Sequence, residues 1–305
     1  MTQMVSDTVK KQLTEFTKNS SQHVDMQRLM TRYAIERFLW RVGQSKHGEM
    51  FTLKGAFALT YHVPQSTRTT KDVDMMAFGQ MTAEKVKAVV TVIATAKAAD
   101  GVSFSAKGIA VRPMGAEGTD HGFSVRIPAR IGFSVCPVDL DISFGDAIFP
   151  EARKHSLPSL IVGKALNPSL KVYPIETIIA EKYQTIVRLG MGNTRLKDHQ
   201  DLYEISRFAA ITGESLRKAI QGTFARRVTA MSIEPEGLSE EFYSDKTRQR
   251  EWKATLSAHN MPKGTGLDEA CEAIAWFVGP VVAAMEKGQE FSMVWRQGKW
   301  KPIDT

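Results

Sequence analysis

The pattern of apolar and polar positions in the first third of the chain predicts helices around two short strands. Apolar residues recur with helical spacing over residues 20–45, which predicts an amphipathic helix. Shorter apolar runs at residues 51–54 and 72–76 predict two strands. Gly55 then lies at a strand-to-helix turn, because residues 56–61 have the character of a helix start.

The pattern changes from strands to helices further along the chain. A helix is predicted over residues 82–98, and three alternating segments after it predict strands at 102–111, 122–127 and 138–144. From Pro174 onward three long segments have helical period, at 174–189, 198–212 and 267–285. Strands followed by helices predict an α+β protein, with a mixed-sheet domain over 1–165 and a mainly α-helical domain over 166–305.

Composition adds a class of partner to this picture. The 305 residues are 43% hydrophobic, enough for a sizeable core, and carry a formal net charge of +7. A positive excess raises the local concentration of polyanions, so nucleic acid and nucleotides are the natural partners. The two cysteines, Cys136 and Cys271, are too few for a disulfide framework or a four-cysteine metal site and are expected to be reduced core thiols.

The sequence predicts a cytoplasmic protein that does not enter the membrane. No window approaches the roughly 18 consecutive apolar residues that span a bilayer. The first sixteen residues also lack the apolar core of a secretory signal.

Two carboxylates in the stretch TKDVD are the first candidate chemistry. On a strand, Asp72 and Asp74 would point to the same face, where they repel each other unless a cation lies between them. Gly55 lies a short distance before them. A glycine there lets the backbone approach a ligand, and the following helix N-terminus offers N–H groups to a phosphate. The pattern alone equally allows a turn glycine beside a surface acidic pair.

A second acidic pair follows in VDLDI, residues 138–142. If this strand neighbours the first one, Asp141 can join Asp72 and Asp74 around a hard cation. Oxygen ligands of this kind suit Mg²⁺, which prefers a few carboxylates plus substrate phosphates. A solvent-facing strand edge would give the same sequence.

The helix at 174–189 carries a lysine on its apolar stripe. Lys182 needs a partner if its ammonium is buried, and a nucleotide phosphate would supply one; otherwise the side chain extends past the stripe to water. Asp198 follows after this helix. It could complement the dipole of the next helix, or it could pair with Lys182 or Arg195.

In this order, the motifs resemble the AbiEii-type nucleotidyltransferases, the toxins of bacterial type IV toxin–antitoxin and abortive-infection pairs, related to the MenT toxins. The resemblance covers most of the chain. It is carried by RYAIER (32–37), FTLKGA (51–56), RTTKDVD (68–74), LDISFGD (140–146), YPIETIIAEK (173–182), NTRLKDHQD (193–201) and FVGP (277–280).

The resemblance implies a polymerase-β-like nucleotidyltransferase domain with a helical C-terminal domain, and a catalytic set. Asp72 and Asp74 correspond to the metal-binding acids, and Asp141 corresponds to the third acid on the adjoining strand. Lys182 resembles the family's essential lysine. Asp198 resembles the motif acid that follows it.

The resemblance also implies a nucleotide-binding set, and the sequence departs from the family pattern at two positions. The set is Lys54, Gly55, Ala56, Arg68, Thr70, Lys182 and Arg195. Ala56 stands where members often have serine or glycine, so phosphate binding there falls to backbone N–H groups. Thr194 stands where many have serine, and it keeps the hydroxyl.

The activity implied is transfer of an NMP unit from an NTP to RNA, at the tRNA 3′ end, with Mg²⁺ or Mn²⁺ as the metal. Such a toxin blocks translation and is paired with a cognate antitoxin, expected to be a transcriptional regulator. Two alternatives stay open: a nucleotide- or RNA-binding protein without turnover, and nucleotidyl transfer to a small molecule or a protein. The complete set of acids favours an enzyme, because a binding protein would be free to lose them.

Overall fold

The structure, a computed structural model, divides the chain into two compact units made of interleaved segments. It describes residues 2–19, 25–64, 66, 70–115, 122–161, 167–258 and 264–303. Unit 1 consists of Met1–Ala58, Thr70–Gly145 and Arg153–Val172, and unit 2 consists of Leu59–Thr69, Asp146–Ala152 and Tyr173–Thr305. The single domain boundary predicted near residue 165 stays a prediction.

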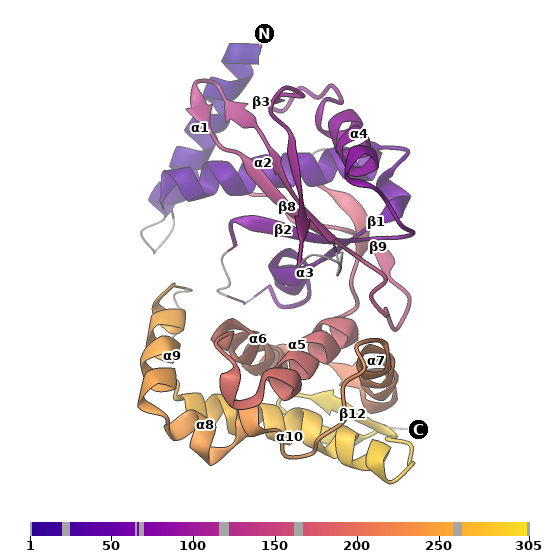
Figure 1. Ribbon diagram of the computed structural model, residues 1–305. Helices are drawn as coiled ribbons and strands as arrows, with labels where there is room; N and C mark the ends of the chain where they lie inside the picture. Colours follow the sequence, from indigo (N-terminus) through magenta and orange to yellow (C-terminus); the bar gives the residue numbers. More distant parts are fainter. Residues whose placement is uncertain are drawn as a thin grey trace. The chain divides into compact units, whose positions relative to one another are not determined.

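Unit 1 is built around a mixed seven-stranded sheet (Figure 1). Its helical segments are α1 (Thr2–Asn19), α2 (Met26–Gln44), η1 (Gly48–Met50), the start of α3 (Gly55–His62), and α4 (Ala83–Ala94). Its strands are β1 (Phe51–Lys54), β2 (Asp72–Ala77), β3 (Val102–Phe104), β4 (Ala110–Met114), β5 (Gly122–Ile127), β6 (Ala129–Ile131), β7 (Ser134–Val135), β8 (Val138–Phe144), β9 (Arg153–Ser156) and β10 (Ser169–Val172).

The order of strands in the large sheet is β4-β5-β8-β2-β1-β10-β9, and β3, β6 and β7 form a small sheet of their own. Strands β2 and β8 run parallel, as do β1 and β10, while the other neighbours are antiparallel. A mixed sheet with helices confirms the predicted α+β class.

The two faces of the sheet differ because polar and apolar residues alternate along its central strands. Val73 and Leu140 are buried on one face, while Asp74 and Asp141 lie on the other and are only half-buried. Helix α2 lies across the strands and contacts β8 and β10, and α4 packs beside it against β4 and β5 (Figure 1). These helices cover the apolar face, so the acidic face is left for chemistry.

Unit 2 is mainly helical. Its helical segments are α5 (Ile175–Leu189), η3 (Gly190–Gly192), α6 (Leu196–Phe208), α7 (Gly213–Arg226), η4 (Glu236–Leu238), α8 (Glu240–Ser244), α9 (Lys246–Ala258) and α10 (Leu267–Glu286). Helix α5 packs against α6 and α7, and α10 packs against α6. A small sheet completes the unit, with β11 (Ile211–Thr212), β12 (Met293–Arg296) and β13 (Lys299–Pro302). In the described ranges no helix combines the length and apolar character needed to cross a bilayer.

Three predicted elements differ from the structure. The strand predicted at 102–111 is two strands, β3 and β4, with Gly108 at a φ of +94° in the interruption between them. The helix predicted at 82–98 ends at Ala94, where Thr95 caps it. The helix predicted at 198–212 ends at Phe208, because residues 211–212 pair with β12.

Candidate functional site

Four carboxylates lie on one face of the sheet in unit 1. In the parallel pair of β2 and β8, Asp72 is in register with Asp139, and Asp74 is in register with Asp141. Residues in register on neighbouring strands point to the same side of a sheet. The structure therefore brings the three predicted acids, Asp72, Asp74 and Asp141, onto one face, and their role as metal ligands stays a prediction.

The Asp74 carboxylate lies against the turn from β1 into α3. Gly55 begins α3 with a φ of +65°, a conformation that residues with a side chain rarely adopt. A Cβ atom on Gly55 would stand 1.9 Å from Asp74 Oδ2 and 2.7 Å from its Cγ. A glycine is thus required here both by its backbone angle and by the space that Asp74 fills. Ala56, the next residue, is 8% exposed.

Polar side chains from β1 and from the segment before β2 complete this face. Lys54 is in register with Asp74, and its Nζ donates to Ser143 Oγ on β8 at 3.1 Å. The Lys54 side chain therefore extends from β1 across β2 to β8. Thr70 donates from its Oγ1 to Asp72 Oδ1, which orients that carboxylate. Arg68, also predicted here, lies outside the described residues.

The donor chemistry of the acidic face fits a hard divalent cation. Its carboxylates offer oxygen ligands on short side chains, and Mg²⁺ commonly takes one or two protein carboxylates and completes its shell with water and substrate phosphates. Within the described part of the chain, no group of three His, Cys, Asp or Glu side chains is placed to hold a metal ion by itself. A metal on this face would have to take further ligands from water and from substrate phosphates, as Mg²⁺ commonly does.

The other predicted catalytic residues form an ionic cluster in unit 2. Lys182 Nζ on α5 lies 2.9 Å from Asp198 Oδ1 and 2.6 Å from Asp201 Oδ2, both on α6. Arg195 Nε donates to the other oxygen of Asp198 at 3.0 Å. The Lys182 side chain is 15% exposed and the two aspartates are 3% and 1% exposed. Lys182 is thus buried with partners, and Asp198 pairs with both basic residues.

Charge balance within the cluster keeps Lys182 and Asp198 ionised near neutral pH. Burial alone would lower the pKa of Lys182, but Asp198 and Asp201 outweigh it and raise that pKa above its usual range. Burial likewise opposes ionisation of Asp198, and Lys182 and Arg195 overcome it and lower its pKa to about 2. Two cations face two anions, so carboxylates already fill the place of the phosphate partner inferred for Lys182. Its contact with nucleotide stays a prediction.

Asp201 and a group of four other polar residues in unit 2 were not among the predicted site residues. Asp201 follows Asp198 by three residues on α6, and this spacing on one helix face was the sequence signal that could have identified it. In the group of four, the Tyr173 hydroxyl donates to Asp146 Oδ2 at 3.0 Å, and Arg227 Nη2 lies 3.2 Å from Glu181 Oε1. The members of this group are far apart in sequence, so no spacing pattern connects them.

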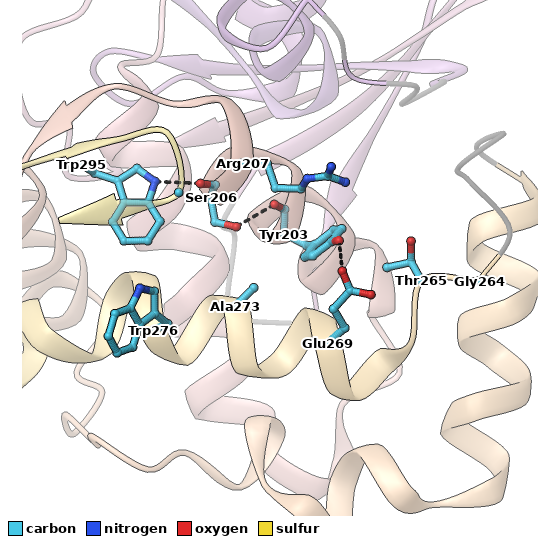
Figure 2. Close-up of a pocket in the computed structure, with 10 residues that line it drawn as sticks. Tyr203, Ser206, Arg207, Gly264, Thr265, Glu269, Ala273, Trp276 and Trp295 are labelled. Carbon is cyan, nitrogen blue, oxygen red and sulfur yellow. Dashed lines mark hydrogen bonds between the residues drawn. The ribbon is translucent and has the colours of Figure 1, made fainter.

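Unit 2 also contains a pocket of about 560 Å³ between α6, α10 and the β12–β13 hairpin (Figure 2). Figure 2 shows Tyr203 directed at Glu269, to which its hydroxyl donates, while Trp295 Nε1 donates to the Ser206 carbonyl oxygen at 2.7 Å. Trp276 is 65% exposed. The pocket includes none of the predicted site residues.

The predicted site residues are thus distributed between the two units. Unit 1 holds Asp72, Asp74, Asp141, Lys54, Gly55, Ala56 and Thr70. Unit 2 holds Lys182, Asp198 and Arg195. Each group is internally connected by the strand register or by the ion pairs described above.

Comparisons with known proteins identify a family. The family model described as "Nucleotidyl transferase AbiEii toxin, Type IV TA system" matches residues 37–276, more than half of the chain. A solved structure of a candidate nucleotidyltransferase from Helicobacter pylori is 14% identical, with a TM-score of 0.51 over 88% of this chain and 100% of that chain. At this identity the likeness shows a shared fold. The structure of JHP933 from Helicobacter pylori is 13% identical, with a TM-score of 0.49 over 87% of this chain and 96% of that one. No curated protein matches the sequence.

Proposed function

The chain belongs to the AbiEii family of nucleotidyltransferase toxins of type IV toxin–antitoxin systems, and from this premise we propose that it transfers NMP from an NTP to the 3′ end of an RNA, with tRNA as the favoured acceptor. The observation that carries the proposal is the register of β2 and β8, which sets Asp74 beside Asp141 and Asp72 two residues away on the same face. A structural ion-pair network would require neither several carboxylates on one face nor a glycine turn against Asp74.

In the proposed reaction the RNA 3′-hydroxyl oxygen attacks the α-phosphorus of the NTP. The new oxygen–phosphorus bond forms as the bond to the β-phosphate bridging oxygen breaks, and pyrophosphate leaves. Asp141 accepts the hydroxyl proton as general base. Asp72, Asp74 and Asp141 would hold Mg²⁺ or Mn²⁺, which when bound neutralises triphosphate charge and favours the deprotonated acceptor hydroxyl.

The residues around the acids would position the nucleotide. The start of α3 at Gly55 and Ala56 offers backbone N–H groups to a phosphate, because the first N–H groups of a helix have no partner within it. Lys54 supplies a positive charge on the same face. In this proposal Thr70 orients Asp72 and Arg68 contributes to nucleotide binding. Lys182 and Arg195 bind a nucleotide phosphate in addition to the carboxylates with which they are paired.

Blocking the 3′ end of tRNA would stop translation, which accounts for toxicity. Membership of a type IV family implies an antitoxin partner, which we propose to be a transcriptional regulator. An NTP and a tRNA as substrates place the proposed reaction in the cytoplasm.

The test is transfer of label from each α-³²P-NTP to total RNA in the presence of Mg²⁺. We expect incorporation by the native chain and its loss, by at least a hundredfold, in Asp74→Asn, because removing one charged group that acts on the transition state commonly has effects of this size, roughly 10²–10³ in rate. Asp139→Asn is the matched control. It removes a carboxylate from the same face that forms an exposed pair with Arg126, 3.1 Å away, and we expect it to retain transfer.

The same assay in a total cell extract identifies the acceptor. Label in the tRNA fraction supports the proposal, whereas label in protein or in small molecules would move the function to another acceptor. If the chain binds RNA but incorporates no NTP, and Asp74→Asn leaves that binding unchanged, the protein is an RNA-binding protein and not a nucleotidyltransferase.

A further inference from the structure

A second pocket lies in unit 1, next to the acidic face. It measures about 430 Å³, within the range of ordinary small-ligand sites. Its wall includes side chains from β3, β5, β6, β7 and the segment before β8, namely Ser103, Phe104, Arg126, Arg130, Val135 and Pro137. We call it the β5–β6 pocket.

The β5–β6 pocket continues the acidic face beyond the ends of β5 and β8. Arg126 is in register with Asp139, and Ser124 is in register with Asp141, so β5 presents its polar side chains on the acidic face. Pro137 directly precedes β8, two residues before Asp139 and four before Asp141. Four residues of strand cover about 13 Å, at 3.2–3.4 Å per residue. A few nucleotides of single-stranded RNA can cover that distance.

Two exposed arginines give the pocket its charge. Arg126 pairs with Asp139, but their side chains are 62% and 44% exposed, and such solvated pairs contribute little and exchange partners readily. Arg130 is also exposed, and its Nη1 donates to the Phe133 carbonyl oxygen at 3.3 Å. Guanidinium groups bind phosphate through two parallel N–H donors.

An exposed aromatic residue follows Arg130 by three positions, and its carbonyl oxygen accepts a hydrogen bond from that guanidinium. Phe133 lies in the turn between β6 and β7 and is 83% exposed. An aromatic ring next to a basic groove is the arrangement on which proteins stack unpaired bases. Ser103 and Ser105 are exposed at the pocket as well and offer hydroxyl groups to a ribose.

We propose that the β5–β6 pocket binds the last nucleotides before the 3′ end of the acceptor RNA, with Arg126 and Arg130 on their phosphates and Phe133 against a base. The terminal 3′-hydroxyl then lies over Asp141. This inference rests on the proposed function, because it assumes that the acceptor is RNA. Single-stranded RNA suits the site better than a protein partner, because the two arginines combine with an open aromatic ring and hydroxyl groups.

The experiment measures RNA binding by the full chain in the absence of NTP. The probe is a twelve-nucleotide single-stranded RNA with a 5′ fluorescein and a free 3′ end, followed by fluorescence anisotropy at several salt concentrations. Arg126→Ala/Arg130→Ala is compared with Lys85→Ala/Lys87→Ala, which removes the same charge from exposed positions of α4. We expect at least tenfold weaker binding for the arginine variant and at most twofold for the lysine variant.

The salt dependence reports which contacts were lost. For two phosphate contacts, the slope of log K against log salt should fall by about 1.4 in the arginine variant, from roughly 0.7 per phosphate on a single strand. Phe133→Ala should weaken binding without changing that slope, because stacking releases no counterions. All variants change exposed side chains, so their thermal melting temperatures should match that of the native chain.

Three outcomes separate this inference from the proposed function. If the native chain labels RNA but the arginine and lysine variants bind the probe equally, the pocket is not the acceptor site although the function stands. If the arginine variant binds RNA normally and instead fails to bind the antitoxin, the pocket is a protein interface and the inference is overturned. If the native chain neither binds nor labels RNA, the proposed acceptor and the pocket's ligand are both wrong.

Discussion

Gly55 is where the backbone and the candidate chemistry of unit 1 meet. Its φ of +65° costs an L-residue about 1–2 kcal/mol, and a methyl group there would overlap the Asp74 carboxylate. The first effect concerns only the backbone, whereas the second displaces a proposed metal ligand. A second glycine allows the two effects to be separated.

Gly55→Ala should abolish nucleotidyl transfer, while Gly79→Ala should preserve it. Gly79 has a φ of +80° and no heavy atom within 4 Å of an added Cβ, so both variants carry the same kind of backbone strain. Each should lower the melting temperature by a few degrees, about 2–4 °C per kcal/mol in a chain of this size. Melting curves and label transfer measured on both variants test this. Equal activity in the two variants would show that Asp74 tolerates displacement.

Asp198 should make the protein sensitive to acid over a defined pH range. Its pKa is lowered to about 2 in the folded state, below the usual value of 3.8, because Lys182 and Arg195 stabilise the carboxylate against the opposing effect of burial. This stabilisation is present above pH 4 and is lost as the pH falls through the folded pKa. It amounts to about 2 kcal/mol, at 1.36 kcal/mol for each pKa unit.

The measurement is urea unfolding of the native chain and of Asp198→Asn at several pH values between 7 and 2. The difference in free energy of unfolding between them should be constant above about pH 5 and should shrink by about 2 kcal/mol towards pH 2. A difference that does not depend on pH would contradict the lowered pKa.

At the scale of elements, the cluster of Lys182, Asp198 and Asp201 joins α5 to α6. Removing one member of a buried ion cluster leaves the others uncompensated, which costs about 3–5 kcal/mol. Loss of activity on changing Lys182 alone would therefore mix a structural effect with a catalytic one. Stability and activity have to be measured together on variants that restore the balance of charge.

Lys182→Met should lower the free energy of unfolding by about 3–5 kcal/mol. The variant Lys182→Met/Asp198→Asn/Asp201→Asn removes the uncompensated charges and should regain most of this loss, since neutral replacement of a whole buried cluster is often well tolerated. If Lys182 also contacts nucleotide, the triple variant will be stable and inactive. Recovery of transfer in the triple variant would make the lysine purely structural.

The sequence predicts elements well where one periodicity is long enough. The acids of β2 and β8 alternate with Val73 and Leu140, so both strands and their polar face follow from the sequence. The register between these strands does not, because it depends on packing between segments far apart in the chain. Strands of two to four residues, such as β6, β7 and β12, are too short to show any period.

The candidate site was predictable to the same extent. Local spacing identified Asp72, Asp74, Gly55, Asp141 and Lys182 as candidates, and the family resemblance then implied their roles. The ion pairs of Lys182 with two aspartates were only half anticipated, since helix–helix packing determines which acids meet a buried lysine. The β5–β6 pocket was not anticipated, because its residues come from three separate stretches of the chain, at 103–105, 126–130 and 135–137.

At the scale of the whole molecule, the chain passes repeatedly between the two units. Unit 2 takes Leu59–Thr69 and Asp146–Ala152 from within the span that was predicted as one N-terminal domain. Within unit 2, Thr177 Oγ1 donates to the Phe149 carbonyl oxygen at 2.9 Å and accepts from its N–H at 3.0 Å. A cut near residue 165 would therefore separate segments that fold against each other.

A fragment of residues 1–165 should not fold, whereas a fragment of residues 1–172 should fold weakly. The shorter fragment lacks β10, which lies between β1 and β9 in the sheet and bonds to both, so its loss exposes the backbone of β1 and leaves β9 without a partner. The longer fragment keeps β10 and differs by only seven residues, which makes it the matched control. Circular dichroism should show a cooperative thermal transition only for residues 1–172, at a lower temperature than in the full chain. A cooperative transition of residues 1–165 would establish the boundary near 165 as that of an independent domain, and the pairing of β10 would then be dispensable to the sheet that carries the acids.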